Sequence, residues 1–197
     1  MRRRLVFVAR HGETDWNAAG RWQGHTDVPL NENGRAQARA LAERLRGARL
    51  GGVVASDLSR AHETARIVAT ELGLTVAYVE RELRERGFGV FEGLTRAECE
   101  ARHGDAWQAW LAHRRPPEGA EGLEGLTGRM VAAVGRAAET LARDEAPALV
   151  VMHGGALRAV VASVTGELPA QVENGAVWVL VWEGRLVGAA PFEPPEA

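Results

Sequence analysis

The sequence predicts an α/β fold, a three-layer sandwich in which helices flank a mostly parallel central sheet of about six strands. Short apolar runs recur along the chain, as expected for strands that are buried on both faces. Longer segments with apolar residues at helical spacing lie between most of these runs. Alternation of strands and helices is typical of a parallel sheet with helices packed on its faces.

Each apolar run is predicted to form one strand of the sheet. The predicted strands are Leu5–Ala9, Val53–Ala55, Val76–Val79, Ala148–Met152, Val177–Val181 and Leu186–Ala189. The segments with helical periodicity cover residues 31–47, 57–73, 122–143 and 155–164. The first two end at Gly47 and Gly73, and glycine is the residue that most often ends a helix.

Residues 80–121 interrupt the alternation of strands and helices. We interpret this segment as an inserted subregion of short helices and loops, and we expect the whole 197-residue chain to form a single domain. The segment contains two tryptophans and two adjacent arginines, Trp107, Trp110, Arg114 and Arg115. These side chains either line a pocket or belong to the core and the surface.

The composition excludes several classes of function. A net charge of −2 argues against a general nucleic-acid or membrane binder, so we expect neither as a partner. All 24 basic residues are arginine, which excludes a Gly-Lys-Ser/Thr phosphate loop and a lysine Schiff base. Because Cys99 is the single cysteine, no disulfide can form within the chain, and we expect a reducing, cytoplasmic location. No apolar run approaches the ~20 residues that a membrane helix needs.

Chemically active side chains follow four of the predicted strands. Arg10 and His11 come directly after the first strand, and Arg60 lies shortly after the second. Glu85 follows the third strand after a short link, and His153 comes directly after the fourth. Ligands bind at the carboxyl ends of the strands in open parallel sheets, so we expect these side chains to meet at one rim.

This set of side chains suits a phosphoryl group. Arginine binds phosphate oxygens in bidentate fashion, and each charge-assisted hydrogen bond contributes about 1.5–3 kcal/mol. A neutral imidazole can attack phosphorus when its other nitrogen is held, and a second histidine can donate protons to phosphoryl oxygens. A carboxylic acid can protonate the leaving oxygen and then activate water. Gly12 and Gly154, beside the two histidines, are expected to let backbone amides approach the anion.

Each of these residues alone also has an ordinary structural interpretation. A strand-end histidine can be a satisfied structural residue, a lone arginine a surface ion pair, and Glu85 part of a charged turn. Two histidines and a carboxylate can also hold zinc, but Arg10 directly beside His11 opposes a divalent cation. Cys99 lacks the arginine six residues on that a cysteine phosphatase loop needs, because Asp105 stands there.

Taken together, the motifs resemble those of the histidine phosphatase superfamily, also called the phosphoglycerate mutase-like family. The resemblance extends from Arg4 to about Val181 and implies a phosphoglycerate mutase-like fold. Five segments carry it in chain order: "RHGETDWN" from residue 10, "RWQGHTDVPLNENGRAQA" from 21, "SDLSRAHETA" from 56, "LRERGFGVFEG" from 83 and "MHGGALRAV" from 152.

The resemblance implies a role for each candidate residue. His11 would be the nucleophile that forms a phosphohistidine, and Glu85 would be the general acid and base. Arg10, Arg60 and His153 would take part in catalysis as well as in binding. The residues that would contact the substrate are Arg10, Asn17, Arg60, His153 and Gly154. Members of this family need no metal or organic cofactor for hydrolysis, so none is expected here.

The resemblance also implies two reactions that share the phosphohistidine. We expect a phosphomonoester hydrolase of the histidine acid phosphatase type, because related mutases are usually longer and "RWQGHTDVPL" looks like the phosphatase branch. A cofactor-dependent phosphoglycerate mutase is the alternative, and a non-catalytic phospholigand-binding protein is the alternative of another class. The substrate would be a small phosphorylated metabolite: a phosphosugar, phosphoglycerate, a nucleoside phosphate or α-ribazole phosphate. A homodimer is left open.

Two departures from the family pattern lie near the expected substrate pocket. Many relatives have Trp where this chain has His25, and many have Gly-Glu-Ser where it has Ala120-Glu121-Gly122. We expect both departures to influence which substrate is chosen. Glu82 competes with Glu85 as the acid, and the pattern Leu-Arg-Glu-Arg-x-x-Gly favours Glu85.

Overall fold

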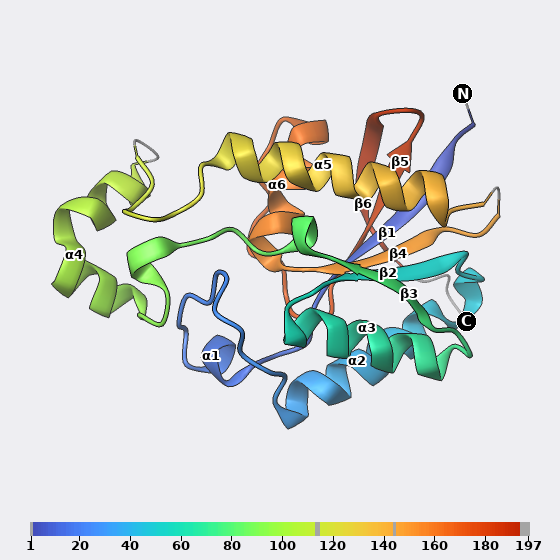
Figure 1. Cartoon of the computed structure of the whole chain (residues 1–197), viewed down its shortest axis with the longest axis horizontal. Helices are drawn as coiled ribbons and strands as arrows, with labels where there is room; N and C mark the ends of the chain where they lie inside the picture. The colour runs from blue at the N-terminus through green and yellow to red at the C-terminus, as the bar shows by residue number, and fades with distance from the viewer. Residues whose placement is uncertain (1, 113–114, 144, 194–197) are drawn as a thin grey trace.

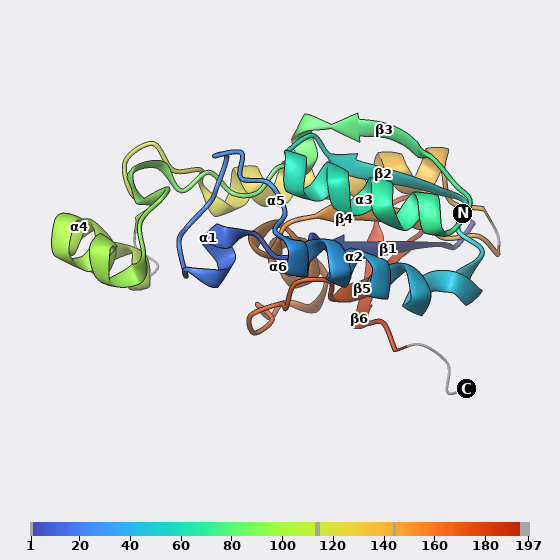
Figure 2. The same ribbon diagram turned by 90° about the horizontal axis from the view of Figure 1, so that it is seen from below.

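A computed structural model describes residues 2–112, 115–143 and 145–193 of the chain. A six-stranded sheet in the order β3-β2-β4-β1-β5-β6 crosses the molecule between helices (Figures 1 and 2). The strands are β1 (Arg4–Arg10), β2 (Gly52–Ser56), β3 (Val76–Glu80), β4 (Ala148–Met152), β5 (Val177–Trp182) and β6 (Leu186–Pro191). The α/β fold and all six predicted strands are confirmed.

The sheet is parallel on one side and antiparallel on the other. β3, β2, β4 and β1 run parallel to one another, whereas β5 is antiparallel to β1 and β6 is antiparallel to β5. A hairpin connection of a few residues is enough for antiparallel neighbours, and residues 183–185 make that connection between β5 and β6. Every residue of the central strand β4 is buried, which explains its unbroken apolar sequence.

Four helices cover the two faces of the sheet. They are α2 (Glu32–Leu45), α3 (Ser59–Glu71), α5 (Leu123–Thr140) and α6 (Gly154–Thr165). Side chains alternate between faces along a strand, so Leu149 and Val151 of β4 pack in the core with α2 and α3. Val150 and Met152 pack in the other core, with α5 and α6. These two cores are the interfaces of the predicted three-layer sandwich.

The segment that interrupts the alternation lies beyond one end of the sheet. It contains the 3₁₀ turns Arg81–Leu83 and Gly89–Phe91 and the helix α4 (Arg96–Leu111), which is kinked at His103. Figure 1 places α4 at the opposite end of the molecule from the chain termini. Cys99 is packed in a small core of this segment.

The paired tryptophans and arginines of this segment have different positions. Trp107 belongs to the same small core as Cys99, and Trp110 lines the main cavity described below. Arg115 is exposed, and Arg114 lies outside the described residues. Along the described stretches of the chain, no helix is both long enough and apolar enough to cross a membrane.

Gly12 allows helix α2 to approach the end of β1. A Cβ atom on Gly12 would collide with the carbonyl oxygen of Gly34 in α2, and one on Gly34 would collide with the backbone of Glu13. The amide of Gly12 donates a hydrogen bond to Thr64 Oγ1 at 3.1 Å. The expectation that the amide of Gly12 approaches an anion is therefore wrong, because this amide already donates to Thr64. The missing side chain of Gly12 instead makes room for α2.

We predict that Gly12→Ala lowers the free energy of unfolding by about 1–3 kcal/mol, because the added methyl group forces backbone atoms apart. Gly47→Ala is the matched control, since no atom lies within 4 Å of a Cβ at that position. Urea unfolding followed by circular dichroism measures both changes. Equal stability of Gly12→Ala and the wild type would contradict the close packing.

Candidate active site

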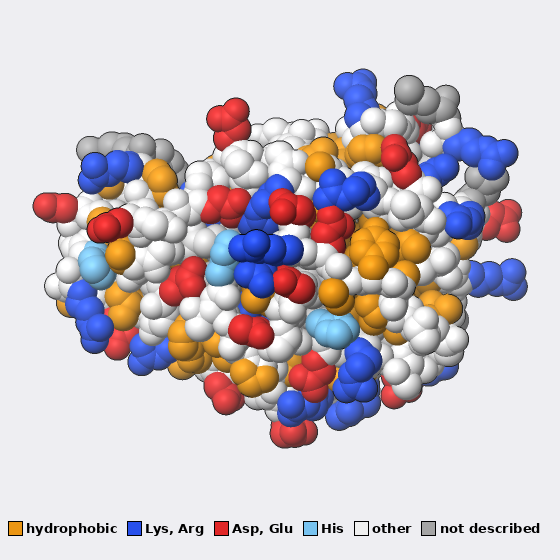
Figure 3. Space-filling model, viewed as in Figure 1, with side chains coloured by type: hydrophobic (Ala, Val, Ile, Leu, Met, Phe, Trp, Pro, Cys, Tyr) orange, Lys and Arg blue, Asp and Glu red, His pale blue; other side chains and the backbone are white. Residues whose placement is uncertain are grey.

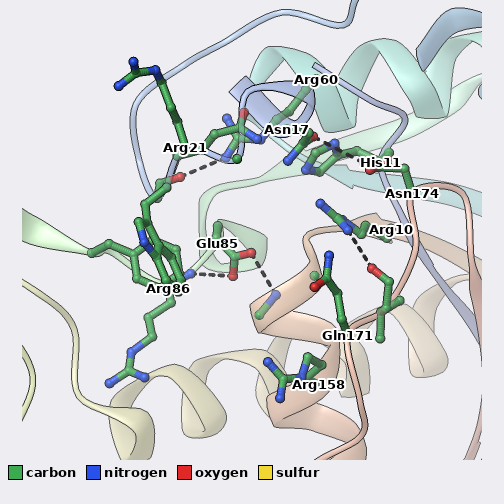
Figure 4. A pocket seen from close by; sticks show the side chains of 18 of the residues that line it. Arg10, His11, Asn17, Arg21, Arg60, Glu85, Arg86, Arg158, Gln171 and Asn174 are labelled. Atoms are coloured by element: carbon green, nitrogen blue, oxygen red, sulfur yellow. Dashed lines mark hydrogen bonds between the residues drawn. The ribbon is translucent and has the colours of Figure 1, made fainter. Parts of the chain in front are cut away.

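Most of the side chains expected at one rim line the same cavity of about 810 Å³. Six of the seven predicted site residues line it: Arg10, His11, Asn17, Arg60, Glu85 and Gly154. Figure 4 shows Arg10, His11 and Arg60 gathered around the same space as Glu85. The seventh residue, His153, packs its ring against that of His11 and is not among the residues that line the cavity.

The register of β1 against β4 brings the two histidines together. Arg10 pairs with Met152 across these parallel strands, so His11 and His153 leave the sheet side by side. The backbone amide of His11 donates to the Met152 carbonyl oxygen at 2.9 Å. The imidazole centroids lie 5.1 Å apart, with an angle of 64° between the ring planes.

The hydrogen bond of His11 determines which ring nitrogen carries the proton. Nδ1 of His11 lies 2.6 Å from the carbonyl oxygen of Gly12. A carbonyl oxygen only accepts hydrogen bonds, so Nδ1 is the donor. The lone pair of the neutral ring is then on Nε2, which is the arrangement that a histidine nucleophile requires.

Both imidazoles are held in the neutral form. Burial, and then the charges of Arg60 and Arg10, keep the pKa of His11 well below its ordinary value, although the bond to Gly12 opposes this shift. Burial and the charge of Arg60 likewise keep the pKa of His153 well below its ordinary value. His11 therefore keeps a lone pair for attack at neutral pH.

His153 is fully buried, and neither of its ring nitrogens has a hydrogen-bond partner among the described residues. Buried polar atoms without a partner are uncommon because they lose their hydration without compensation. An oxygen of a ligand held beside His11 is a group that can satisfy one of these nitrogens. This neighbour of His11 is thus suited to contact a bound phosphoryl group.

Arg60 and Arg10 place two cations beside the histidines. Arg60 is completely buried, and its two terminal nitrogens donate to the carbonyl oxygens of Thr26 and Gly24 at 2.9 and 2.8 Å. Arg10 donates to the carbonyl oxygen of Val172 at 2.6 Å. The Nε atom of each arginine is buried, and within residues 2–112, 115–143 and 145–193 it has no partner.

Neither arginine has a carboxylate partner in the described part of the chain. Burial lowers the pKa of Arg60 to about 10, and the nearby charge of Glu85 opposes this shift. Burial also lowers the pKa of Arg10. Both groups remain charged at neutral pH, and a buried charge without a counter-ion costs free energy. An anionic ligand between them would offset that cost.

The carboxylate of Glu85 is held by three backbone amides, two of them at the start of α6. The amides of Arg86 and Ala156 donate to Oε1, and the amide of Gly155 donates to Oε2, each at 2.8 Å. A Cβ on Gly155 would lie 2.6 Å from Oε1, so glycine makes room for the carboxylate there. A carboxylate oxygen has two lone pairs, which leaves Oε2 able to carry a proton.

The structure distinguishes between the two candidate acids. Glu85 is 8% exposed and lines the cavity, whereas Glu82 is exposed and does not line this cavity of the described residues. The position therefore agrees with the choice that the sequence pattern favours.

The side-chain oxygen of Asn17 is already used in hydrogen bonds within the protein. Its side-chain NH₂ group is left for a ligand. Its Oδ1 accepts hydrogen bonds from the amide and hydroxyl of Thr14, both at 3.2 Å, in the capping box of helix α1 (Asp15–Ala18). Asn174 also donates to this oxygen at 3.3 Å, and it donates to the backbone oxygen of His11 at 2.9 Å. Asn174 thus ties the segment before β5 to the predicted nucleophile.

A large part of the cavity wall was not predicted from the sequence. The missed residues with polar or aromatic side chains include Arg21, Trp22, Arg86, Phe88, Arg158, Gln171, Glu173 and Asn174. The loop before β5 reaches the site because β5 is antiparallel to β1, so its start lies beside the end of β1. For Gln171, Glu173 and Asn174, the missing signal was therefore the direction of β5.

Among the residues that the structure describes, no three His, Cys, Asp or Glu side chains are grouped so that they could hold a metal ion.

Comparison with known proteins connects the chain to one family. A model described as "Histidine phosphatase superfamily (branch 1)" matches residues 6–186. Phosphoglycerate mutase-like protein 4 from Arabidopsis thaliana is 39% identical over 157 residues, which cover 78% of this chain and 67% of that protein. "Probable phosphoglycerate mutase GpmB" from Yersinia pestis (strain Pestoides F) is 38% identical over 178 residues, covering 86% and 78% of the two proteins.

A solved structure of similar fold belongs to a phosphatase. Mycobacterial glucosyl-3-phosphoglycerate phosphatase, in complex with VO3, superposes with a TM-score of 0.84 at 30% sequence identity. The match covers 95% of this chain and 97% of that chain.

We predict that the free energy of unfolding falls as the pH is lowered from about 6.5 to about 5, because unfolded histidines bind protons there and the buried His11 and His153 do not. Each histidine contributes a slope of about 1.4 kcal/mol per pH unit. Urea unfolding at several pH values measures the slope, which should be shallower in His153→Asn. Equal slopes in the two proteins would rule out a buried, neutral His153.

Proposed function

The chain belongs to the histidine phosphatase superfamily, and from this premise we propose that it is a phosphomonoester hydrolase that acts through a phosphohistidine. The observation that carries the proposal is the neutral His11, with Nδ1 held by Gly12, next to the buried Arg60 and the partly buried Arg10. Neither arginine forms an ion pair with a carboxylate of the described residues. The substrate would be a small phosphorylated metabolite, which a cavity of about 810 Å³ can hold.

In the proposed complex, the phosphoryl group lies between Arg10 and Arg60, beside His11. The arginines offset the charge of the phosphoryl oxygens, and Asn17 and the amide of Gly154 at the start of α6 add further donors. A ring N–H of His153 donates to a phosphoryl oxygen. The organic part of the substrate extends toward the aromatic side chains of the cavity, Trp22, Phe88 and Trp110.

The proposed reaction has two steps. Nε2 of His11 attacks phosphorus, the bond from phosphorus to the leaving oxygen breaks, and protonated Glu85 donates its proton to that oxygen. Water then attacks the phosphohistidine while Glu85 takes a proton from it. The nitrogen–phosphorus bond breaks, inorganic phosphate is released, and His11 returns to its neutral form.

A second candidate is a cofactor-dependent phosphoglycerate mutase, which the names of the Arabidopsis and Yersinia relatives favour. A mutase would transfer the phosphoryl group from His11 to a bound phosphoglycerate instead of water. Formation of 2-phosphoglycerate from 3-phosphoglycerate, primed by 2,3-bisphosphoglycerate, distinguishes the mutase from the hydrolase. A protein that binds phosphate esters and turns over none of them would be the non-catalytic alternative.

The remaining expectations about partners stay proposals. We propose hydrolysis without a metal or organic cofactor, a cytoplasmic location, and no nucleic-acid or membrane partner. On the face seen in Figure 3, arginine side chains and acidic side chains are interspersed, which supports the absence of a basic binding surface there. A homodimer remains a proposal that sedimentation can test.

We predict that the protein hydrolyses p-nitrophenyl phosphate in the presence of EDTA and that His11→Ala abolishes turnover, because no phosphohistidine can form. Release of p-nitrophenol measures the rate. Trapping of labelled phosphate on the wild type, and not on the variant, checks the intermediate. Substantial turnover by His11→Ala would refute the nucleophile, and an inactive wild type toward all phosphomonoesters would refute the hydrolase.

We predict that Glu85→Gln slows hydrolysis of phenyl phosphate by roughly 10²–10⁴, the usual size of a general-acid effect. The loss on p-nitrophenyl phosphate should be smaller, because p-nitrophenol is the stronger acid and leaves with less protonation. Steady-state kcat for the two esters gives the comparison. Equal losses on both esters would show that Glu85 does not protonate the leaving oxygen.

A further inference from the structure

Two side chains from distant parts of the sequence meet at the backbone carbonyl of Glu85. His25 Nε2 lies 2.9 Å from this oxygen, and a terminal nitrogen of Arg129 donates to it at 2.9 Å. Because a carbonyl oxygen can only accept, Nε2 of His25 carries a hydrogen. The oxygen has two lone pairs, so these two donors satisfy it completely.

Arg129 on α5 binds the same loop at two further carbonyl oxygens. It donates to Glu82 at 2.7 Å and to Arg84 at 2.6 Å. Its remaining two N–H groups donate to the carboxylate of Glu121, both at 2.6 Å. All five N–H groups of the guanidinium are therefore used, and none is left for a ligand.

Glu121 connects this network to the residues after Glu85. Its amide donates to the carbonyl oxygen of Gly87 at 2.9 Å, and its own carbonyl oxygen accepts from Arg86 Nε at 2.8 Å. The side chains of Arg129 and Glu121 are only 16% and 23% exposed, so the ion pair is well shielded from solvent. The loop that carries the acid is thus fixed on both sides of Glu85.

The expected part of His25 and Glu121 in substrate choice is not supported by their positions. His25, Glu121 and Arg129 are absent from the described residues that line the cavity. Their contacts are made with the backbone around Glu85 instead. Any effect of these three residues on the reaction therefore has to be exerted through the position of Glu85.

We propose that His25 and Arg129 are positioning residues for the general acid, an inference that rests on the proposed function. The carboxylate of Glu85 is held by the amides at the start of α6, and its backbone is held by His25 and Arg129. Both attachments are needed to keep Oε2 within reach of the leaving oxygen. Misplacement of a catalytic group by about 1 Å can cost about 100-fold in rate.

The test compares His25→Leu and Arg129→Met on phenyl phosphate and p-nitrophenyl phosphate. The kcat for phenyl phosphate should fall about tenfold in His25→Leu and about 100-fold in Arg129→Met, because its leaving group depends on the acid. The kcat for p-nitrophenyl phosphate should fall much less. Competitive inhibition by vanadate should be unchanged, since neither residue touches the phosphate site.

Two control variants separate positioning from general stability. His25→Gln keeps an N–H donor and should restore most of the rate on phenyl phosphate. Arg136→Met removes another arginine of α5, one that pairs with Glu80, and should leave both rates unchanged. Circular dichroism establishes that each variant is folded. If Arg129→Met does not fold, the exposed residue His25 carries the test alone.

The decisive comparison repeats His25→Leu in the Glu85→Gln background. A residue that acts through the Glu85 carboxyl should cause little further loss once that carboxyl is gone. The same loss in both backgrounds, or equal losses on both esters, would overturn the inference. A wild-type protein that hydrolyses neither ester would instead refute the proposed function, and the inference would fall with it.

Discussion

The site is governed by two arginines, one buried and one partly buried, that are paired with no carboxylate among the described residues. Arg10 and Arg60 lie where the parallel strands end, and their charges help to keep His11 and His153 neutral. The same charges favour an anion in the space between them. One arrangement therefore prepares the nucleophile and selects the ligand. A cationic ligand or an extra buried proton would be unfavourable in this space.

The acid is placed by a different kind of interaction. Glu85 lies on a loop, and loops acquire a defined position only when other segments hold them. Here α6 holds the carboxylate, while α5 and the loop around His25 hold the carbonyl. The inserted segment contributes Glu121, whose carboxylate accepts two hydrogen bonds from Arg129 and so orients its guanidinium toward the loop. Segments that are far apart in the sequence thus determine together the position of one carboxyl group.

Strand patterns and strand ends could be predicted because they are local. Apolar runs such as Ala148–Met152 stand out in the sequence, and parallel strands place their carboxyl ends at one edge. On this basis Arg10, His11, Arg60 and Glu85 are expected at one edge of the sheet. In the structure they line one cavity. The loop before β5 could not be placed at the site in this way, because the antiparallel direction of β5 depends on how the sheet is assembled.

The order of residues along the chain is enough to predict which chemical groups are present and at which strand ends they lie, because apolar periodicity and position in the chain are local properties. The contacts that hold these groups in position became visible in the folded structure. Gly12 makes room for α2, and His25 and Arg129 meet at the backbone of Glu85. These contacts join residues far apart in the chain, so no local pattern encodes them, and packing around the sheet creates them.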